Sequence, residues 1–313
     1  CGDSWGAPVS TGPQIDIAFG LDARYAPHAA QVIASVARYA PGANIRFIML
    51  HVGIDAALQK RVESVAPSAR FLWIEVGEKD LPAYEDRGHL NRTVLFRLGL
   101  ETLAPVDCTR IIYLDADIVV LGDVRELWAS DLKGAPIGAV RDAYVDPDEF
   151  AEKWGRPVGK SFYFNAGMMV IDLAQVRAEK SFSAALEFVV KHNSELLLGD
   201  QDALNYTFWG RWQSVDPAWN VQRYLSPKER EEEQEEPLRK WRRASPAMVH
   251  FIGVEKPWMP NIWHPWAWLY WMALDHTPFK REVAATNKMD AYQLMRLRAR
   301  WWLRKPAAAK AIA

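Results

Sequence analysis

The sequence predicts an α/β fold in which a mixed, mainly parallel sheet is flanked by helices. Three observations support this prediction. From residue 15 onward, short apolar segments alternate with amphipathic ones, which is typical of repeated βαβ units. The segment 111–121, IIYLDADIVVL, contains the apolar run expected of a buried central strand. Half of the 313 residues are hydrophobic, so the chain can bury a large core.

The first half of the chain has the clearest alternation. The predicted strands and helices follow one another as strand 15–19, helix 27–39, strand 45–50, helix 55–65, strand 70–76, helix 91–103 and the strand from Ile111. Pro41-Gly42 supplies a stop after the first helix. No GxGxxG or GxxxxGK[ST] motif follows a strand, which argues against dinucleotide and P-loop sites.

The second half is more mixed. Strands are predicted at 136–140, 166–173 and 248–253, and helices at 181–192 and 200–209. Ser181 is expected to be the N-cap of its helix, because serine is a preferred capping residue. The segment 226–246 carries six Glu followed by basic residues, which is typical of a solvated insertion.

Bulk properties narrow the possible partners and compartment. The net charge of −1 predicts no binding to nucleic acid. The two cysteines form no disulfide framework, so a reducing, cytoplasmic compartment is expected. Residues 1–13 begin without a leader pattern and are expected to be a disordered or vector-derived N-terminus. Residues 14–265 are expected to form the catalytic domain, and 266–313 a Trp-rich, basic helical tail.

Asp115 and Asp117 follow the apolar run that starts at Ile111. Ligands bind at the carboxyl ends of strands in open α/β sheets. Two oxygen ligands one residue apart can hold a hard divalent cation, which can grip a diphosphate. The alternative is an acidic turn without a ligand, because Asp is common in turns.

Four further segments strengthen the prediction that Asp115 and Asp117 bind a cation. They are FGLDARY from Phe19, FNAGMMVIDL from Phe164, GDQDALN from Gly199 and HFIGVEKPW from His250. Together with LDADIVV they resemble the family 8 glycosyltransferases, which are retaining enzymes of the Rossmann-like GT-A fold that use nucleotide sugars. The resemblance runs from about residue 15 to residue 258 and extends to bacterial lipopolysaccharide galactosyl- and glucosyltransferases and to glycogenin-like enzymes.

The resemblance implies a role for each matching residue. Asp115, Asp117 and His250 would bind Mn²⁺, with Mg²⁺ as a possible substitute. Gln201 and Asp200 would be the catalytic residues. The donor nucleotide sugar would be bound by Gly20, Asp22, Arg97, Asp115, Ala116, Asp117, Asn165, Ala166, Gly167, Asp200, Gln201, His250, Gly253 and Lys256. Arg24 departs from the Asn that is more usual in the first loop, which puts base contacts there in doubt.

Purely structural roles are the alternatives for several of these residues. Asp200 could cap its helix, His250 could be a core histidine, and Arg97 could be a solvated helix residue. Asp22 and Asn165 could be turn formers.

A different enzyme class is the competing hypothesis. The segment DADIV also fits the active-site motif of haloacid-dehalogenase-like phosphatases, in which Asp115 would be the nucleophile. That motif normally lies on the first strand, whereas at least three predicted strands precede it here.

The resemblance also predicts the reaction partners. The donor is expected to be UDP-glucose or UDP-galactose, and the acceptor a carbohydrate or glycolipid such as lipopolysaccharide core, or a protein hydroxyl. The loop 81–90 with His89 is expected to contact the acceptor. The helix predicted at 290–305 has two apolar stripes with basic residues between them, which is typical of binding to an anionic membrane surface. The protein is thus expected in the cytoplasm or on the inner face of the plasma membrane.

Overall fold

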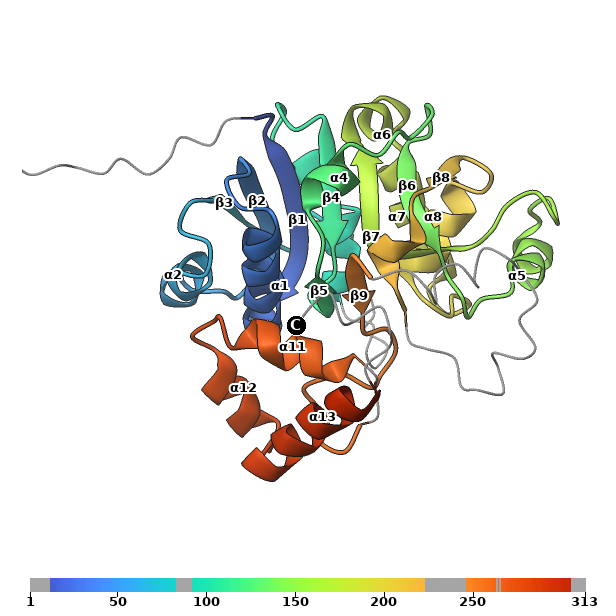
Figure 1. The fold of residues 1–313 in the computed structure, drawn as a ribbon. Coiled ribbons are helices and arrows are strands. Elements are labelled where there is room, and N and C mark those ends of the chain that lie inside the picture. Colours follow the sequence, from blue (N-terminus) through green and yellow to red (C-terminus); the bar gives the residue numbers. More distant parts are fainter. Residues whose placement is uncertain (1–11, 83–91, 223–245, 263, 265, 305–313) are drawn as a thin grey trace, which may run out of the picture.

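The computed structural model describes residues 12–82, 92–222, 246–262, 264 and 266–304. Its main sheet has seven strands in the order β3-β2-β1-β4-β7-β6-β8 (Figure 1). Their bounds are β1 Ile15–Asp22, β2 Ile45–Val52, β3 Arg70–Glu75, β4 Arg110–Leu114, β6 Ile137–Arg141, β7 Phe164–Asp172 and β8 Trp212–Ser214. Strands β1 to β4 are parallel and β7 is antiparallel to both neighbours. The predicted mixed, mainly parallel sheet is confirmed.

The central strand ends earlier than its apolar run suggested. β4 stops at Leu114, and the chain resumes as β5 (Ile118–Val120), which pairs antiparallel with β9 (Met248–His250) in a separate two-stranded sheet. Asp115 to Asp117 therefore form the link between the two sheets. This register places Ile118 opposite His250.

Helices cover the sheet (Figure 1). Their bounds are α1 Ala26–Tyr39, α2 Ala56–Glu63, η1 Arg92–Arg97, α3 Leu100–Leu103, α4 Val124–Trp128, α5 Pro147–Trp154, α6 Leu173–Glu179, α7 Ser181–His192, α8 Asp200–Thr207, η2 Pro217–Asn220, α11 Ala267–Leu274, α12 Lys280–Thr286 and α13 Ala291–Arg304. Within the described residues, none of these helices is long and apolar enough to cross a membrane.

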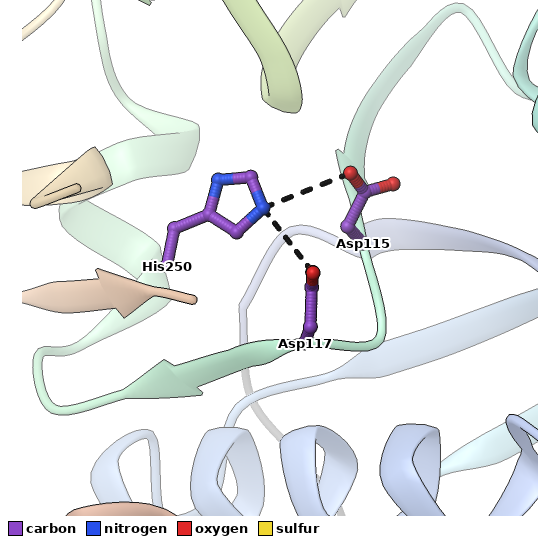
Figure 2. Close-up of side chains that lie close together, drawn as sticks. All are labelled: Asp115, Asp117 and His250. Carbon is purple, nitrogen blue, oxygen red and sulfur yellow. Dashed lines mark ion pairs between the residues drawn. The ribbon is translucent and has the colours of Figure 1, made fainter. Parts of the chain in front are cut away.

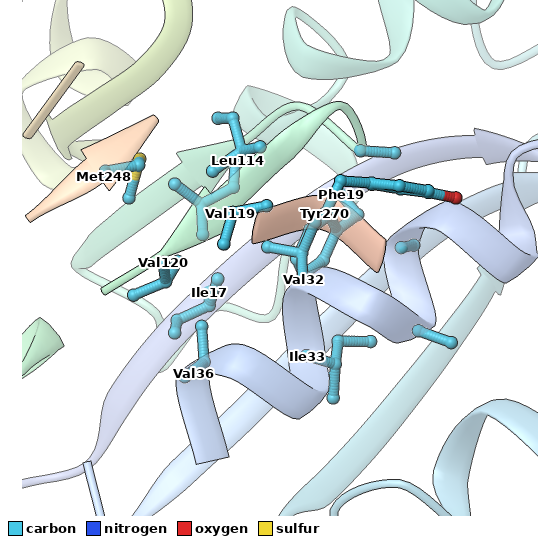
Figure 3. Close-up of a cluster of buried hydrophobic side chains, with 14 of the residues drawn as sticks. Ile17, Phe19, Val32, Ile33, Val36, Leu114, Val119, Val120, Met248 and Tyr270 are labelled. Carbon is cyan, nitrogen blue, oxygen red and sulfur yellow. The ribbon is translucent and has the colours of Figure 1, made fainter. Parts of the chain in front are cut away.

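The largest core cluster lies between β1, α1, β5 and α11 (Figure 3). Ile17, Val32 and Val119 are fully buried there, and each such side chain contributes about 1.5–3 kcal/mol by leaving water. Tyr270 of α11 packs into the same cluster. Trp266 and Trp271 are also buried, so this part of the Trp-rich segment belongs to the main core.

Two details of the predicted helices are wrong. The helix expected at 91–103 is a 3₁₀ helix, η1, followed by the short α3. η1 packs so closely on β1 that a Cβ on Gly20 would lie 2.9 Å from the Phe96 Cβ. Ser181 is the first residue of α7, and Lys180 occupies the N-cap position. The N–H groups of Phe182 and Ser183 in the first turn donate to Glu101.

Other predictions fall on residues outside the described part of the chain. The insertion 226–246 is described only at Pro246. The acceptor loop 81–90 is described only at Leu81 and Pro82, so His89 lies outside. Of the N-terminal segment 1–13, only the last two residues are described.

Candidate active site

Three side chains of the kind that bind metals converge where the two sheets meet (Figure 2). His250 Nε2 lies 3.1 Å from Asp117 Oδ1 and 3.8 Å from Asp115 Oδ2. One ligand atom from each residue lies within 4.8 Å of the other two. The β5–β9 pairing explains the arrangement, because it brings His250 beside the link that carries both aspartates.

Gly167 leaves the space in which these groups meet. A Cβ at this position would lie 2.1 Å from His250 Cε1 and 2.7 Å from Asp115 Oδ2. The backbone of Gly167 also holds the cluster, since its carbonyl accepts a hydrogen bond of 2.8 Å from the Asp115 N–H. Only glycine fits this close approach between backbone and side chains.

The free atoms of the cluster fit a divalent cation. Asp117 Oδ1 is buried and accepts no hydrogen bond, and it faces His250 Nε2. The Oδ1 atom of Asp115 accepts from Tyr113 and Arg97, which leaves Oδ2 directed at the cluster. Two carboxylate oxygens and one imidazole nitrogen form a donor set that binds ions such as Mn²⁺ or Mg²⁺.

Lys256 lies beside this cluster. Its ammonium group donates to Asp117 Oδ2 at 2.5 Å and to the Phe251 carbonyl at 2.8 Å. Burial alone would raise the pKa of Asp117, but Lys256 and His250 outweigh it and lower this pKa below its usual value. Asp117 is therefore ionised, as a metal ligand must be.

The loop that carries Lys256 is anchored from two sides. Trp258 stacks on His28 of α1 at 3.7 Å between ring centres. The indole N–H of Trp271 in α11 donates to the Pro257 carbonyl at 2.9 Å. The C-terminal helix α11 thereby helps to position Lys256.

Arg97 is buried next to the cluster. Its guanidinium contacts Asp200 at 2.6 Å, Asp115 at 3.1 Å and the Ala166 carbonyl at 2.6 Å. Burial alone would lower the pKa of Arg97, but the two carboxylates raise it above its ordinary value. Burial raises the pKa of Asp200 to about 6 although Arg97 opposes this shift. The alternative of a solvated Arg97 is wrong.

The side-chain amide of Gln201, in the segment GDQD, connects this segment to the segment FNAG. Its Oε1 accepts from the Ala166 N–H at 2.9 Å and its Nε2 donates to Asp142 at 3.2 Å. Asn165 also donates to Asp142, at 3.0 Å. Gly199 occupies the N-cap position of α8, so the capping alternative for Asp200 is wrong.

The family follows from one comparison. The model of glycosyl transferase family 8 matches residues 16–261. The chain is a family 8 glycosyltransferase.

Relatives and solved structures agree with this assignment. General stress protein A of Bacillus subtilis (strain 168) is 31% identical over 242 residues, which are 74% of this chain and 83% of that protein. Lipopolysaccharide 1,2-glucosyltransferase of Escherichia coli (strain K12) is 24% identical over 297 residues, covering 94% and 86%. The crystal structure of galactosyltransferase LgtC with donor and acceptor sugar analogs has a TM-score of 0.68 and 26% identity, and covers 90% of this chain and 100% of that chain. The phosphatase alternative finds no support in these comparisons.

Asp22, Gly20 and Gly253 are further donor-site candidates of the glycosyltransferase. Asp22 caps its own turn by accepting from the N–H groups of Arg24 and Tyr25, as expected of a turn former, and it also forms an ion pair with Arg24. A Cβ on Gly20 would meet Phe96 and would lie 3.6 Å from the hydroxyl of Tyr113, which donates to Asp115. Gly253 has a φ of +75°, which glycine adopts without strain.

Two buried residues of the glycosyltransferase site were not predicted. Asp142 holds Asn165 and Gln201, and Asn220 contacts the second ring nitrogen of His250 at 3.1 Å. Asp142 follows the strand predicted at 136–140, so its place at a strand end was a usable signal. Asn220 carries no local signal, because its role depends on η2 lying against β9.

Proposed function

We propose that this family 8 glycosyltransferase transfers glucose or galactose from the corresponding UDP-sugar to an acceptor hydroxyl, with Mn²⁺ held by Asp115, Asp117 and His250. The observation that carries the proposal is the convergence of their three ligand atoms beside Lys256. A bound divalent cation would supply Lewis-acid neutralisation of the leaving diphosphate. The relatives named as a glucosyltransferase and a galactosyltransferase support a hexose donor.

Lys256 and Gly253 would serve the diphosphate. Lys256 already lies at the edge of the cluster, where its charge can face a phosphate. At about 4 Å and an effective dielectric constant near 20, such a contact is worth roughly 4 kcal/mol before desolvation. The absence of a side chain at Gly253 would let the loop backbone approach the phosphates closely.

The sugar would lie over Arg97, Asn165, Asp200 and Gln201. We infer retention of the anomeric configuration from the family resemblance. A covalent double displacement needs a carboxylate next to the anomeric carbon, and the family position that faces this carbon matches Gln201, whose amide is a poor nucleophile. Front-face attack follows: the bond from the anomeric carbon to UDP breaks, the bond to the acceptor oxygen forms, and the acceptor proton passes to the departing phosphate. Asp200 would position Arg97 next to the sugar.

The acceptor is proposed to be a glycolipid or lipopolysaccharide. The name of the Escherichia coli relative supports this class. A membrane-bound acceptor also agrees with the C-terminal segment 266–313, which we propose associates with an anionic membrane surface on its cytoplasmic side.

The exposed residues of helix α13 support the proposed association with a membrane. Leu297 is buried against the rest of the chain, whereas Tyr292, Met295 and Trp302 are about 60% exposed. The basic residues Arg296 and Arg298 are exposed on the same helix. One apolar stripe thus packs inward, and a second faces solvent beside cationic groups, as in helices that lie in a membrane interface.

A donor screen tests the proposal. The purified protein would be incubated with Mn²⁺ and each of several UDP-sugars, and UDP release would be measured. We expect hydrolysis of UDP-glucose or UDP-galactose well above that of the other sugars. Acceptor trials with the preferred donor would follow, and NMR of the first product should show the α-anomer. A β-linked product from the α-donor would contradict retention.

A further inference from the structure

Four buried polar side chains form a continuous chain of hydrogen bonds that ends at the aspartate–histidine cluster. Asp142 Oδ2 accepts from Asn165 Nδ2 at 3.0 Å, and Asn165 Oδ1 accepts from Asn220 Nδ2 at 3.0 Å. Asn220 Oδ1 lies 3.1 Å from His250 Nδ1. All four residues are at least 95% buried, so water does not compete for these bonds. We call these residues the amide relay.

The direction of the relay is set at Asn165. The oxygens of Asp142 accept from the Tyr144 N–H and from the Gln201 amide, so the Asn165 atom that faces the same carboxylate is the amide nitrogen. A backbone N–H only donates, and the Gly167 N–H lies 3.1 Å from the other atom, which must therefore be oxygen. Two independent neighbours thus fix the same orientation of the Asn165 amide.

This orientation passes along the chain to His250. Because Asn165 presents an oxygen, Asn220 must turn its nitrogen toward it; the reverse orientation would place two acceptors 3.0 Å apart. Asn220 then presents its own oxygen to His250 Nδ1. A ring nitrogen that faces an acceptor is satisfied only when it carries a proton.

We propose that Asn220, held by Asn165, is a positioning residue that keeps a proton on Nδ1 of His250, so that Nε2 is the ring nitrogen left to bind a cation beside Asp117. Nε2 faces Asp117 Oδ1 at 3.1 Å, so a cation bound by both atoms would take the place of any proton on Nε2. The proposal rests on the proposed function for the role of that cation, but the tautomer itself does not depend on it.

The tautomer can be observed directly. Long-range ¹H–¹⁵N spectra of the ¹⁵N-histidine-labelled protein distinguish rings that carry a proton on Nδ1, on Nε2 or on both. The chain has seven histidines, and the signals missing from His250→Gln identify His250. We expect Nδ1 of His250 to carry a proton in the metal-free protein. A wild-type ring in the Nε2–H form would overturn the proposal.

Variants separate positioning from simple packing. In Asn220→Leu the Nδ1 acceptor is gone, so the proton should move to Nε2, where Asp117 Oδ1 accepts it. Asn220→Asp keeps an acceptor for Nδ1 and should keep its proton there, although its second oxygen opposes Asn165 Oδ1 and breaks that link of the relay. Asn165→Ala does not remove the acceptor for Nδ1, but it frees the Asn220 amide to turn, and a mixture of tautomers is expected. Circular dichroism would confirm that each variant is folded.

Binding of Mn²⁺ alone, measured by EPR without nucleotide, provides the second readout. Loss of an outer hydrogen-bond partner typically weakens metal binding 10- to 100-fold, and we expect a loss in this range, about 10- to 100-fold, for Asn220→Leu. Asn220→Asp, which keeps the acceptor for Nδ1, should weaken Mn²⁺ binding less than Asn220→Leu does. An unchanged tautomer in folded Asn220→Leu would overturn the proposal. A wild type with the Nδ1–H form but no Mn²⁺ binding would instead contradict the proposed function and leave the relay intact.

Discussion

Lys256 Nζ lies 2.5 Å from Asp117 Oδ2, whereas His250 Nε2 lies 3.1 Å from Asp117 Oδ1. The two oxygens of one carboxylate thus face two different groups. Oδ1 is left for a cation, and Oδ2 holds an ammonium group at the edge of the same cluster. We therefore expect Lys256 to exchange Asp117 for a phosphate of the donor when the donor binds.

Replacement of Lys256 by Met tests this role. A hydrogen bond to a charged group contributes about 1.5–3 kcal/mol, so kcat/KM should fall about 10- to 150-fold. Binding of Mn²⁺ alone should not weaken, because the variant removes a positive charge from beside Asp117. Lys60→Met, an exposed change on α2, is the matched control. A variant with wild-type kcat/KM would show that Lys256 does not contact the donor.

Gly167→Ala and Gly20→Ala form a matched pair. The new Cβ at Gly167 would collide with His250 and Asp115, so Mn²⁺ binding should weaken about tenfold or more, as for other losses of ligand positioning. The new Cβ at Gly20 would instead meet Phe96 at 2.9 Å and should lower stability without a comparable loss of Mn²⁺ affinity. Isothermal titration with Mn²⁺ and thermal melting measure the two effects. Equal Mn²⁺ affinity in both variants would contradict the assigned role of Gly167.

The first part of the fold was predictable because local signals agree with the tertiary structure. β1, β2 and β3 begin at Ile15, Ile45 and Arg70, as predicted. The helix α5 was missed although Asp146 caps it and Pro147 begins it, both of which are standard start signals. The capping of α7 by Glu101 could not be read locally, because it comes from a distant helix.

The site was predictable only where residues form motifs. Asp115, Asp117, His250 and Lys256 lie in recognisable segments, and the structure brings them together. Asp202 shares a motif with Asp200, yet it accepts hydrogen bonds from the N–H groups of Leu197 and Leu198 and does not face the cluster. A motif therefore does not separate structural from chemical residues. Only the fold makes this distinction.

The stability of the protein should depend on His28. Burial lowers its pKa from 6.5 to about 4. Between these values the unfolded chain binds the proton and the folded chain does not, so stability is complete above about pH 6.5 and falls as the pH drops. The loss between pH 7 and pH 5 should be about 2 kcal/mol. Urea unfolding of the wild type and His28→Gln at both pH values measures it. Identical pH dependence in the two proteins would exclude this role of His28.

The exposed stripe of α13 should be needed for membrane binding. Replacement of Tyr292, Met295 and Trp302 by Ser removes apolar surface while the basic residues remain, and these contribute at most about 1 kcal/mol each near an anionic leaflet. Co-sedimentation with anionic vesicles should fall about tenfold or more, and binding of the wild type should weaken as salt increases. Replacement of the exposed Val190 and Leu197 by Ser is the control. Undiminished sedimentation of the triple variant would show that the stripe has another role.

The cluster of Asp115, Asp117 and His250 is expected to hold a divalent cation that sugar transfer requires. The most direct test is the rate of UDP release from the preferred UDP-hexose, measured for the wild type in Mn²⁺ and in excess EDTA, and for Asp117→Asn in Mn²⁺. Glu187→Gln, which changes an exposed carboxylate on α7, is the control. We expect full activity of the wild type and of the control in Mn²⁺, and partial activity in Mg²⁺. The rate should fall at least about 100-fold in EDTA and in Asp117→Asn, because a metal contributes several kcal/mol to charge stabilisation. Full activity in EDTA or in Asp117→Asn would contradict the requirement for a cation.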